Sequence, residues 1–151
     1  MAWKDVRAAV RDLLAGVEIT EPQSLAIRHV FEFPPAAIEP GDVPCFVMMP
    51  PARNQDWAPN YWRTRTYEMR IMCLVRDEQS GPAANIVDAF AEAAMGVLIP
   101  AIKLGEVDTS VTIVTGPNID EPGSVQYGAR AFVGFDMHIT LRFEEAVAFA
   151  T

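Results

Sequence analysis

Four side chains in the sequence are of the types that bind zinc: His29, Cys45, Cys73 and His138. Imidazole nitrogens and thiolates are the usual ligands of tetrahedral zinc sites. Zinc ligands normally occur as local pairs a few residues apart, and these four residues form no such pair. The sequence therefore favours one core histidine, one surface histidine and two buried thiols, and we expect no metal and no cofactor.

Both cysteines lie in apolar patterns typical of strands, Cys45 in VPCFVMM and Cys73 in YEMRIMCLV. Reduced cysteine behaves there as a small buried hydrophobe. A nucleophilic cysteine needs a histidine partner and exposed, electropositive surroundings, and neither cysteine has such a setting in the sequence. Free, unreactive thiols are the favoured interpretation, and a disulfide is the less favoured alternative.

Strong catalytic motifs are absent from the sequence. It contains no Gly-rich phosphate loop, no G-x-S-x-G, no H-E-x-x-H and no pair of C-x-x-C sequences. Asp120 and Glu121 could act as an acid and a base, but adjacent carboxylates in a turn-forming stretch such as GPNIDEPGS usually point apart into solvent. We expect an acidic loop at this position.

Aromatic and cationic residues concentrate in residues 50–66, PPARNQDWAPNYWRTRT. Trp, Tyr and Arg are enriched at protein interfaces, so this segment is a candidate partner contact. The candidate residues are Arg53, Trp57, Tyr61, Trp62, Arg63 and Arg65. The segment is interpreted as irregular and too long for an ordinary turn. Two alternatives stay open: the tryptophans could fold back onto the core, or the cluster could stack on a nucleic acid.

Two helices are predicted. In the first, over MAWKDVRAAVRDLL, the apolar residues Val6, Val10, Leu13, Leu14 and Val17 fall on one face, and Gly16 is a plausible end. The second is predicted over residues 77–102. Its inward stripe contains Ile86, Phe90, Ala93, Ala94 and Val97. Pro100 should end or kink this helix, because proline lacks a backbone donor.

Strands are predicted between and after the helices. They cover residues 24–33, with His29 on the apolar face, and residues 43–49, 67–75 and 111–116. Residues 67–75 form a candidate central strand, because one alternate set is wholly apolar and Met72 and Leu74 extend an apolar patch onto the second face. A partner protein is one candidate to cover that second face.

The longest alternation runs through residues 127–145, YGARAFVGFDMHITLRFEE. Every second residue from Tyr127 to Phe143 is apolar apart from the tyrosine hydroxyl, which is the period of a strand. Such a strand would be roughly 55 Å long, whereas ordinary strands have about 3 to 10 residues. Gly134 could mark a bend or bulge that divides it into two strands in line.

The order α, β, β, β, α, β, β predicts an α+β fold: a mainly antiparallel sheet of about five strands, two helices on one face, and a long C-terminal β-ribbon. With 151 residues, half of them hydrophobic, the chain fits one domain, residues 1–151. No apolar run approaches the roughly 18 residues of a membrane span, and the charged first helix is unlike a signal peptide. A formal charge of −8 argues against general nucleic-acid binding.

Four features together resemble a protein family. They are the amphipathic helix AWKDVRAAVRDLLAG, the proline-bounded strands ending in VPCFVMMPP, the strand TRTYEMRIMCLVRDE leading into the helix AANIVDAFAEAAMGVL, and the closing YGARAFVGFDMHITLRF. In this order they resemble the tail terminator and tail completion proteins of long-tailed bacteriophages and related neck proteins. The resemblance covers most of the chain and rests on architecture, without an invariant catalytic string.

The resemblance implies a non-enzymatic virion protein of the tail or neck, assembled in the host cytoplasm. It implies a ring of identical subunits, commonly a hexamer, that caps the head-proximal end of the tail tube, stops its polymerisation and docks the head connector or stopper protein. The expected partners are other copies, the tube protein and the connector. Genome DNA would pass through the lumen without specific binding, and no membrane is involved.

Within this interpretation the arginine and aromatic cluster of residues 50–66 would contact a subunit or the tube. Asp120 and Glu121 would lie in a loop facing the lumen or a partner. A head–tail adaptor or stopper is the alternative of the same kind. A small-molecule enzyme or ligand-binding α+β domain is the alternative of a different class, and it requires a deep pocket with convergent polar groups.

Overall fold

The computed structural model describes residues 3–21, 23–50, 52–58, 62–77, 84–103, 111–119 and 123–146, and it describes the side chains of residues 6–21, 23–50, 66–76, 84–99, 119 and 123–142. The helices are α1 (Trp3–Ala15) and α2 (Ala84–Lys103), with one 3₁₀ turn at Pro40–Asp42. The strands are β1 (Glu18–Ile19), β2 (Leu25–Ala26), β3 (His29–Phe31), β4 (Cys45–Met48), β5 (Ala52–Ala58), β6 (Trp62–Asp77), β7 (Val111–Ile119), β8 (Gly123–Tyr127) and β9 (Arg130–Ala146).

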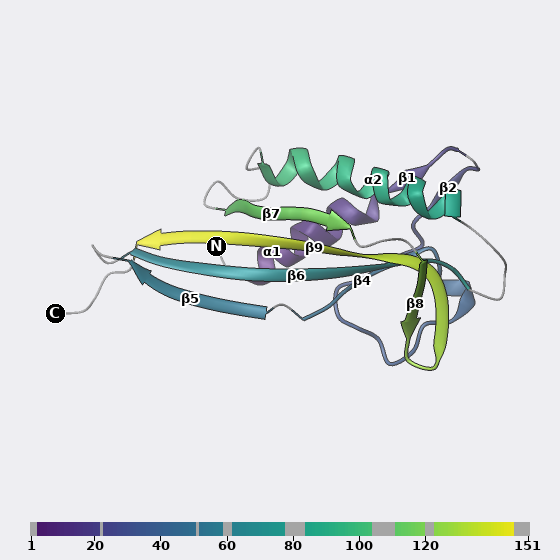
Figure 1. The fold of residues 1–151 in the computed structure, drawn as a ribbon, viewed down its shortest axis with the longest axis horizontal. Helices are drawn as coiled ribbons and strands as arrows, with labels where there is room; N and C mark the ends of the chain where they lie inside the picture. Colours follow the sequence, from purple (N-terminus) through teal and green to yellow (C-terminus); the bar gives the residue numbers. More distant parts are fainter. Residues whose placement is uncertain are drawn as a thin grey trace.

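Two long strands, β6 and β9, form the centre of the main sheet and lie along the long axis of the molecule (Figure 1). They pair antiparallel from Trp62↔Ala146 to Asp77↔Phe132. Along the edge of β6 that faces away from β9, the first half of β6 pairs with β5 and the second half with β4. Along the edge of β9 that faces away from β6, the start of β9 pairs with β8 and its later part with β7. Only the pair of β3 and β4 is parallel among the described strands of this sheet. The strands β1 and β2 form a separate antiparallel pair.

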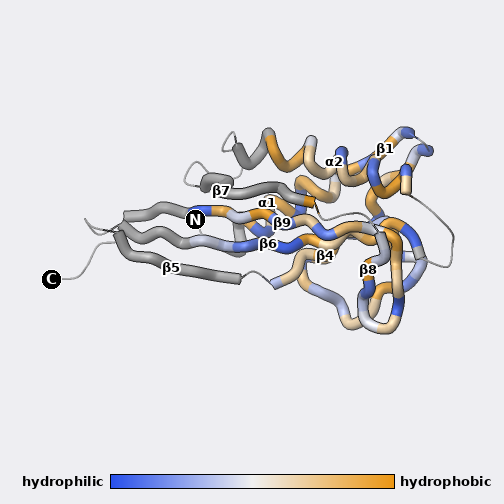
Figure 2. The backbone as a smooth tube through the Cα atoms, in the orientation of Figure 1, coloured by the Kyte–Doolittle hydropathy of each residue, from blue (hydrophilic) through white to orange (hydrophobic). Residues whose placement is uncertain are grey.

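The helices cover one face of the main sheet, so the predicted α+β class with a mainly antiparallel sheet is confirmed. Alternate residues of β6, β9 and β4 pack against α1 and α2, and Figure 2 shows the hydrophobic residues gathered at this junction. We call this cluster the helix-side core. Its strand members include Tyr67, Met69, Ile71, Cys73, Val75, Phe135, Met137, Ile139 and Leu141, which the alternation predicts.

The two helices bury the expected stripes with small differences. In α1, Val6, Val10 and Leu14 are fully buried. In α2 the buried residues are Ile86, Val87, Phe90, Ala91, Ala94 and Leu98, so Val87 and Leu98 join the predicted stripe and Ala93 and Val97 lie at its margin. The helix continues past Pro100 to Lys103, so Pro100 does not end it, and the alternative that Pro100 kinks the helix stays a prediction.

At one end of the second face of the sheet, the described part of the chain itself covers the strands. Met72 and Leu74 pack there with Cys45, Val47 and Phe132. Ile38 and Val43, from the segment between β3 and β4, complete this second core. The Tyr127 hydroxyl donates a hydrogen bond to the carbonyl oxygen of Pro35 and ties the β8–β9 hairpin to the same segment. No partner is therefore needed over Met72 and Leu74.

The predicted strand over residues 24–33 is divided in the structure. Only Leu25–Ala26 and His29–Phe31 are strands, and they belong to two different sheets. His29 is half exposed and its Nε2 lies 3.8 Å from Asp42 Oδ1. The prediction of a core histidine is therefore wrong, because the chain leaves the β1–β2 pair after Ala26 and re-enters at an edge of the main sheet, where side chains meet water.

At Gly134 the two central strands approach each other closely. The register shifts between Leu74↔Gly134 and Arg76↔Val133, so Val75 is an extra residue in β6. A Cβ atom on Gly134 would lie 1.9 Å from the Cys73 carbonyl oxygen. Only glycine fits such a backbone approach, as expected for a bulge. The predicted irregularity is present, and β9 continues through it as one strand of 17 residues.

Candidate assembly interface

The aromatic and cationic segment, predicted to be irregular, is a β-hairpin. Residues Ala52–Ala58 pair antiparallel with Trp62–Glu68 through seven consecutive register positions. The prediction failed because ARNQDWA has no apolar alternation, which a strand needs only when one of its faces is buried. Here the pairing extends the edge of the sheet along β6.

The register places five of the six predicted contact residues. Trp57 is the Cα partner of Arg63, and Gln55 is the partner of Arg65. Arg63 and Arg65 occupy the alternate set of β6 that contains Tyr67, a residue of the helix-side core, whereas Trp62 occupies the opposite set. Arg53 pairs with Tyr67. Tyr61, Asp120 and Glu121 lie outside the described residues, so their predicted roles remain predictions.

Open strand edges flank this end of the sheet. Among the residues that the structure describes, β5 pairs only with β6, and β7 pairs only with β9. The strand order across this region is therefore β5-β6-β9-β7, with outer strands of seven and nine residues. An unpaired edge presents a row of backbone N–H and C=O groups that can pair with another chain. In Figure 1 β5, β6 and β9 end together at one tip of the molecule.

The face of β6 and β9 opposite the helices is polar where the second core does not cover it. Arg70 donates from Nε and Nη2 to the two carboxylate oxygens of Asp136, at 3.3 and 3.0 Å. Glu68, His138 and Arg142 on the same face are exposed. The described part of this face therefore carries charges of both signs, which are suited to polar contacts.

A third surface feature lies next to α1 and was not predicted. Phe33 is 63% exposed, and the Arg7 guanidinium carbon lies 4.6 Å from the centre of its ring. This cation–π contact stabilises an aromatic side chain at the surface. Nearby, Arg11 Nη1 donates to Glu32 Oε2 at 2.7 Å and joins α1 to the same segment. The alternation of residues 24–33 gave no signal for this arrangement, because it placed Phe33 in the core.

The residues considered for metal or nucleophilic chemistry do not converge. Cys45 is in the second core and Cys73 in the helix-side core, on opposite faces of the sheet, and both thiols are free. Burial raises the pKa of Cys45 to about 12, with a smaller contribution from the negative charge of Asp42. Burial also raises the pKa of Cys73. Such thiols stay protonated and are poor nucleophiles at neutral pH.

The histidines are also separated. His29 is the register partner of Cys45, whereas His138 lies between Arg70 and Asn118 in the sheet. Within the described part of the chain, no group of three or more His, Cys, Asp or Glu side chains is arranged to hold a metal ion. The described helices include none whose length and hydrophobicity would allow it to cross a bilayer.

Comparison with known proteins adds no family assignment. No protein-family model matches the chain, and no curated protein matches it at a significant level.

Proposed function

We propose that this protein is a structural component of a bacteriophage virion. It assembles as a ring of identical subunits at the head-proximal end of the tail tube, ends tube polymerisation and presents a docking surface to the head connector. It performs no reaction. The proposal joins the sequence resemblance to one structural observation, which is the pair of long central strands flanked by β5 and β7, each of which pairs with a single strand among the described residues.

The length of the central strands supports an assembly role. β6 and β9 contain 16 and 17 residues, and at roughly 3.3 Å per residue each measures about 50 to 55 Å. The 20 residues of α2 measure about 30 Å at a rise of 1.5 Å per residue. The central strands are therefore longer than the longer of the two helices that cover them, and the additional length provides surface for neighbouring molecules.

The open edges are suited to a ring. β5 lies at one edge of the sheet and β7 at the other, so the contact between one copy and the next can use two different surfaces. Contacts between unlike surfaces continue from copy to copy and close into a ring when the rotation allows. The formal charge of −8 suits a channel for DNA, because repulsion of like charge keeps the passing genome from sticking.

The proposal is tested by assembly of the purified chain, alone and with tubes of its cognate tube protein. Native mass spectrometry and negative-stain electron microscopy should show a ring of defined copy number, free or attached to one tube end. Tubes grown with the protein present should stop elongating. A head–tail adaptor or stopper would bind the connector and leave tube growth unchanged. A monomer that neither forms rings nor caps tubes would refute the proposal.

The contact residues are tested by substitution. The double variant Trp57→Ala and Trp62→Ala should remain folded, with an unchanged far-ultraviolet circular dichroism spectrum, but should no longer assemble. The matched control, Trp57→Phe and Trp62→Phe, keeps an aromatic ring at both positions and should assemble. Normal assembly of the double alanine variant would remove these residues from the interface.

A further inference from the structure

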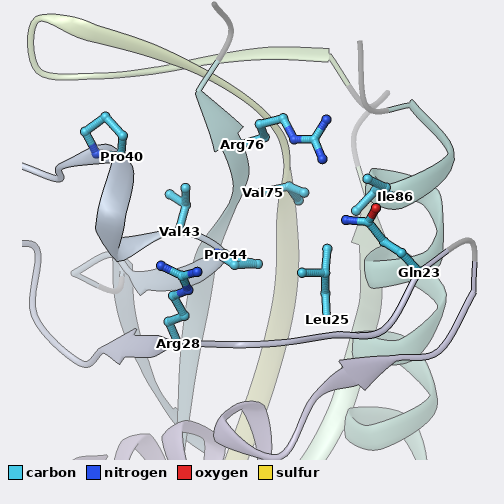
Figure 3. Close-up of a pocket in the computed structure, with 9 residues that line it drawn as sticks. All are labelled: Gln23, Leu25, Arg28, Pro40, Val43, Pro44, Val75, Arg76 and Ile86. Carbon is cyan, nitrogen blue, oxygen red and sulfur yellow. The ribbon is translucent and has the colours of Figure 1, made fainter. Parts of the chain in front are cut away.

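A pocket with two arginines lies at the end of the sheet opposite the hairpin formed by β5 and β6. It forms where the end of β6 meets the start of α2, the β1–β2 pair and the segment before β4 (Figure 3). Its volume is about 200 Å³. The lining residues are Gln23, Leu25, Arg28, Pro40, Val43, Pro44, Val75, Arg76 and Ile86.

The apolar part of the lining comes from side chains that also contribute to the cores. Val43, Val75 and Ile86 are buried at 8%, 4% and 7% exposure, and Leu25 is partly buried. Because these side chains are fixed by packing, the pocket is preformed. Its volume is suited to one or two amino-acid side chains, well below the roughly 300 to 1,000 Å³ of a site for a drug-sized ligand.

The two guanidinium groups differ in how they are held. Arg28 Nη1 donates to the Gly41 carbonyl oxygen at 2.9 Å, and the Arg28 backbone N–H donates to the Pro44 carbonyl oxygen at 2.8 Å. Arg28 is thus positioned and retains further donors. Arg76 is half-buried and, among the described residues, makes no ion pair or hydrogen bond from its side chain. A half-buried cation without a carboxylate partner favours an external anion.

The lining distinguishes the type of anion. A hydrated phosphate ion has no apolar part to place against Leu25, Val75 and Ile86. A carboxylate attached to an aliphatic or aromatic group fits both the arginines and the apolar wall. Its oxygens accept hydrogen bonds from the guanidinium N–H groups, while its apolar part covers the pocket wall. Arginine is well suited to this task, since its planar donors match the carboxylate geometry.

We infer that this pocket receives an acidic side chain together with an adjoining apolar residue, and that a second copy of this chain supplies them. The chain contains 20 acidic residues against 12 basic ones, so neighbouring copies are a rich source of carboxylates. Val75 and Arg76 lie at the end of β6 opposite Trp62. A contact from this end to another region of the next copy joins unlike surfaces, as a ring requires. The assignment of the acidic side chain to a second copy rests on the proposed ring, whereas the chemistry of the pocket does not.

The chemistry of the pocket is tested with 4-phenylbutyrate as a probe, using amide chemical shifts of the full chain. A ligand of this size should bind with a dissociation constant of about 1 mM or a few times higher. The shifts should be largest around Leu25, Val75 and Ile86. The uncharged analogue 4-phenylbutyramide should bind at least about tenfold more weakly, because the charge-assisted hydrogen bonds are lost. Inorganic phosphate should not displace the probe.

The role of the cation is tested with Arg76→Gln, which should fold normally because Arg76 has no described partner, and should weaken probe binding about tenfold or more. The matched control is Arg142→Gln, an exposed arginine on the open face of the sheet, which should bind the probe like the unaltered protein. Equal binding of the amide and the carboxylate, equal binding by Arg76→Gln, or no binding of the probe would overturn the inference.

The source of the acidic group is tested by assembly. Arg76→Gln should reduce the ring population, and the loss should resemble the effect of raised salt on the unaltered protein. If Arg76→Gln loses probe binding but assembles like the unaltered protein, a second copy does not supply the acidic side chain. If the unaltered protein forms no rings under any condition, the proposed function fails, and the probe experiment still decides the pocket chemistry.

Discussion

Substitution of Gly134 by alanine should destabilise the protein strongly. The added Cβ would lie 1.9 Å from the Cys73 carbonyl oxygen, 3.0 Å from the Cys73 carbonyl carbon and 3.3 Å from Leu74 Cα. Ordinary contact begins at 3.4 Å, so the two backbones would have to separate by about 1.5 Å. All three atoms belong to main chain, and no side-chain rotation can relieve the overlap.

The expected loss of stability follows from the separation of the two strand backbones. Separation of the backbones disrupts the pairs Leu74↔Gly134 and Cys73↔Phe135 and lifts Phe135 from the helix-side core. Insertion of atoms into a packed interior costs about 1 to 3 kcal/mol, and a main-chain overlap belongs at the upper end. We expect Gly134→Ala to lower the free energy of unfolding by about 3 kcal/mol. For a chain of this size that corresponds to a Tm lower by roughly 6 to 12 °C.

The assay is thermal and urea unfolding followed by far-ultraviolet circular dichroism, with Gly96→Ala as the matched control. Gly96 is exposed in α2, and a Cβ there meets nothing within 4 Å. Alanine is favoured over glycine in a helix by roughly 0.5 to 1 kcal/mol, so the control should raise the Tm. A Gly134→Ala variant as stable as the unaltered protein would refute the close approach of β9 to β6.

Two further predictions concern the second core. The folded-state pKa of Cys45, about 12, exceeds the usual value of 9.0, so its contribution to stability is complete below about pH 9 and is lost as the pH rises toward 12. The free energy of unfolding should therefore fall over this range, and Cys45→Ala should flatten the dependence in urea titrations at pH 8 to 11. Tyr127→Phe removes the hydrogen bond to the Pro35 carbonyl and should lower the free energy of unfolding by about 1 kcal/mol, as measured by urea denaturation; an unchanged midpoint would show that this bond is replaced by water.

The central strands could be predicted from the sequence because each has one face in the helix-side core. Burial of one face imposes apolar residues at every second position, and that pattern is visible from Tyr67 to Val75 and from Phe135 to Leu141. β5 left no such signal, because its pairing comes from backbone hydrogen bonds along an edge. Its sequence, ARNQDWA, is compatible with a loop as well as with an edge strand.

The positions of single side chains were harder to predict than the strands. His29 and Phe33 share the alternation of Leu25 and Ile27, yet both are exposed, because the chain passes from one sheet to the other between them. The pocket with Arg28 and Arg76 could not be predicted for a related reason. Its lining comes from segments distant in sequence that only the finished fold brings together.

The pairing of β6 with β9 also has a consequence for how the chain folds during synthesis. Arg70 and Asp136, which pair across the two strands, are 66 residues apart in the sequence. At about 5 to 20 residues per second, a ribosome needs roughly 3 to 13 s to make the intervening chain. During that interval β6, with its alternate apolar side chains, has one edge that is not yet paired with β9. Such a delay exposes a nascent polypeptide to chaperones and to aggregation, and contacts of high sequence separation also slow refolding in vitro.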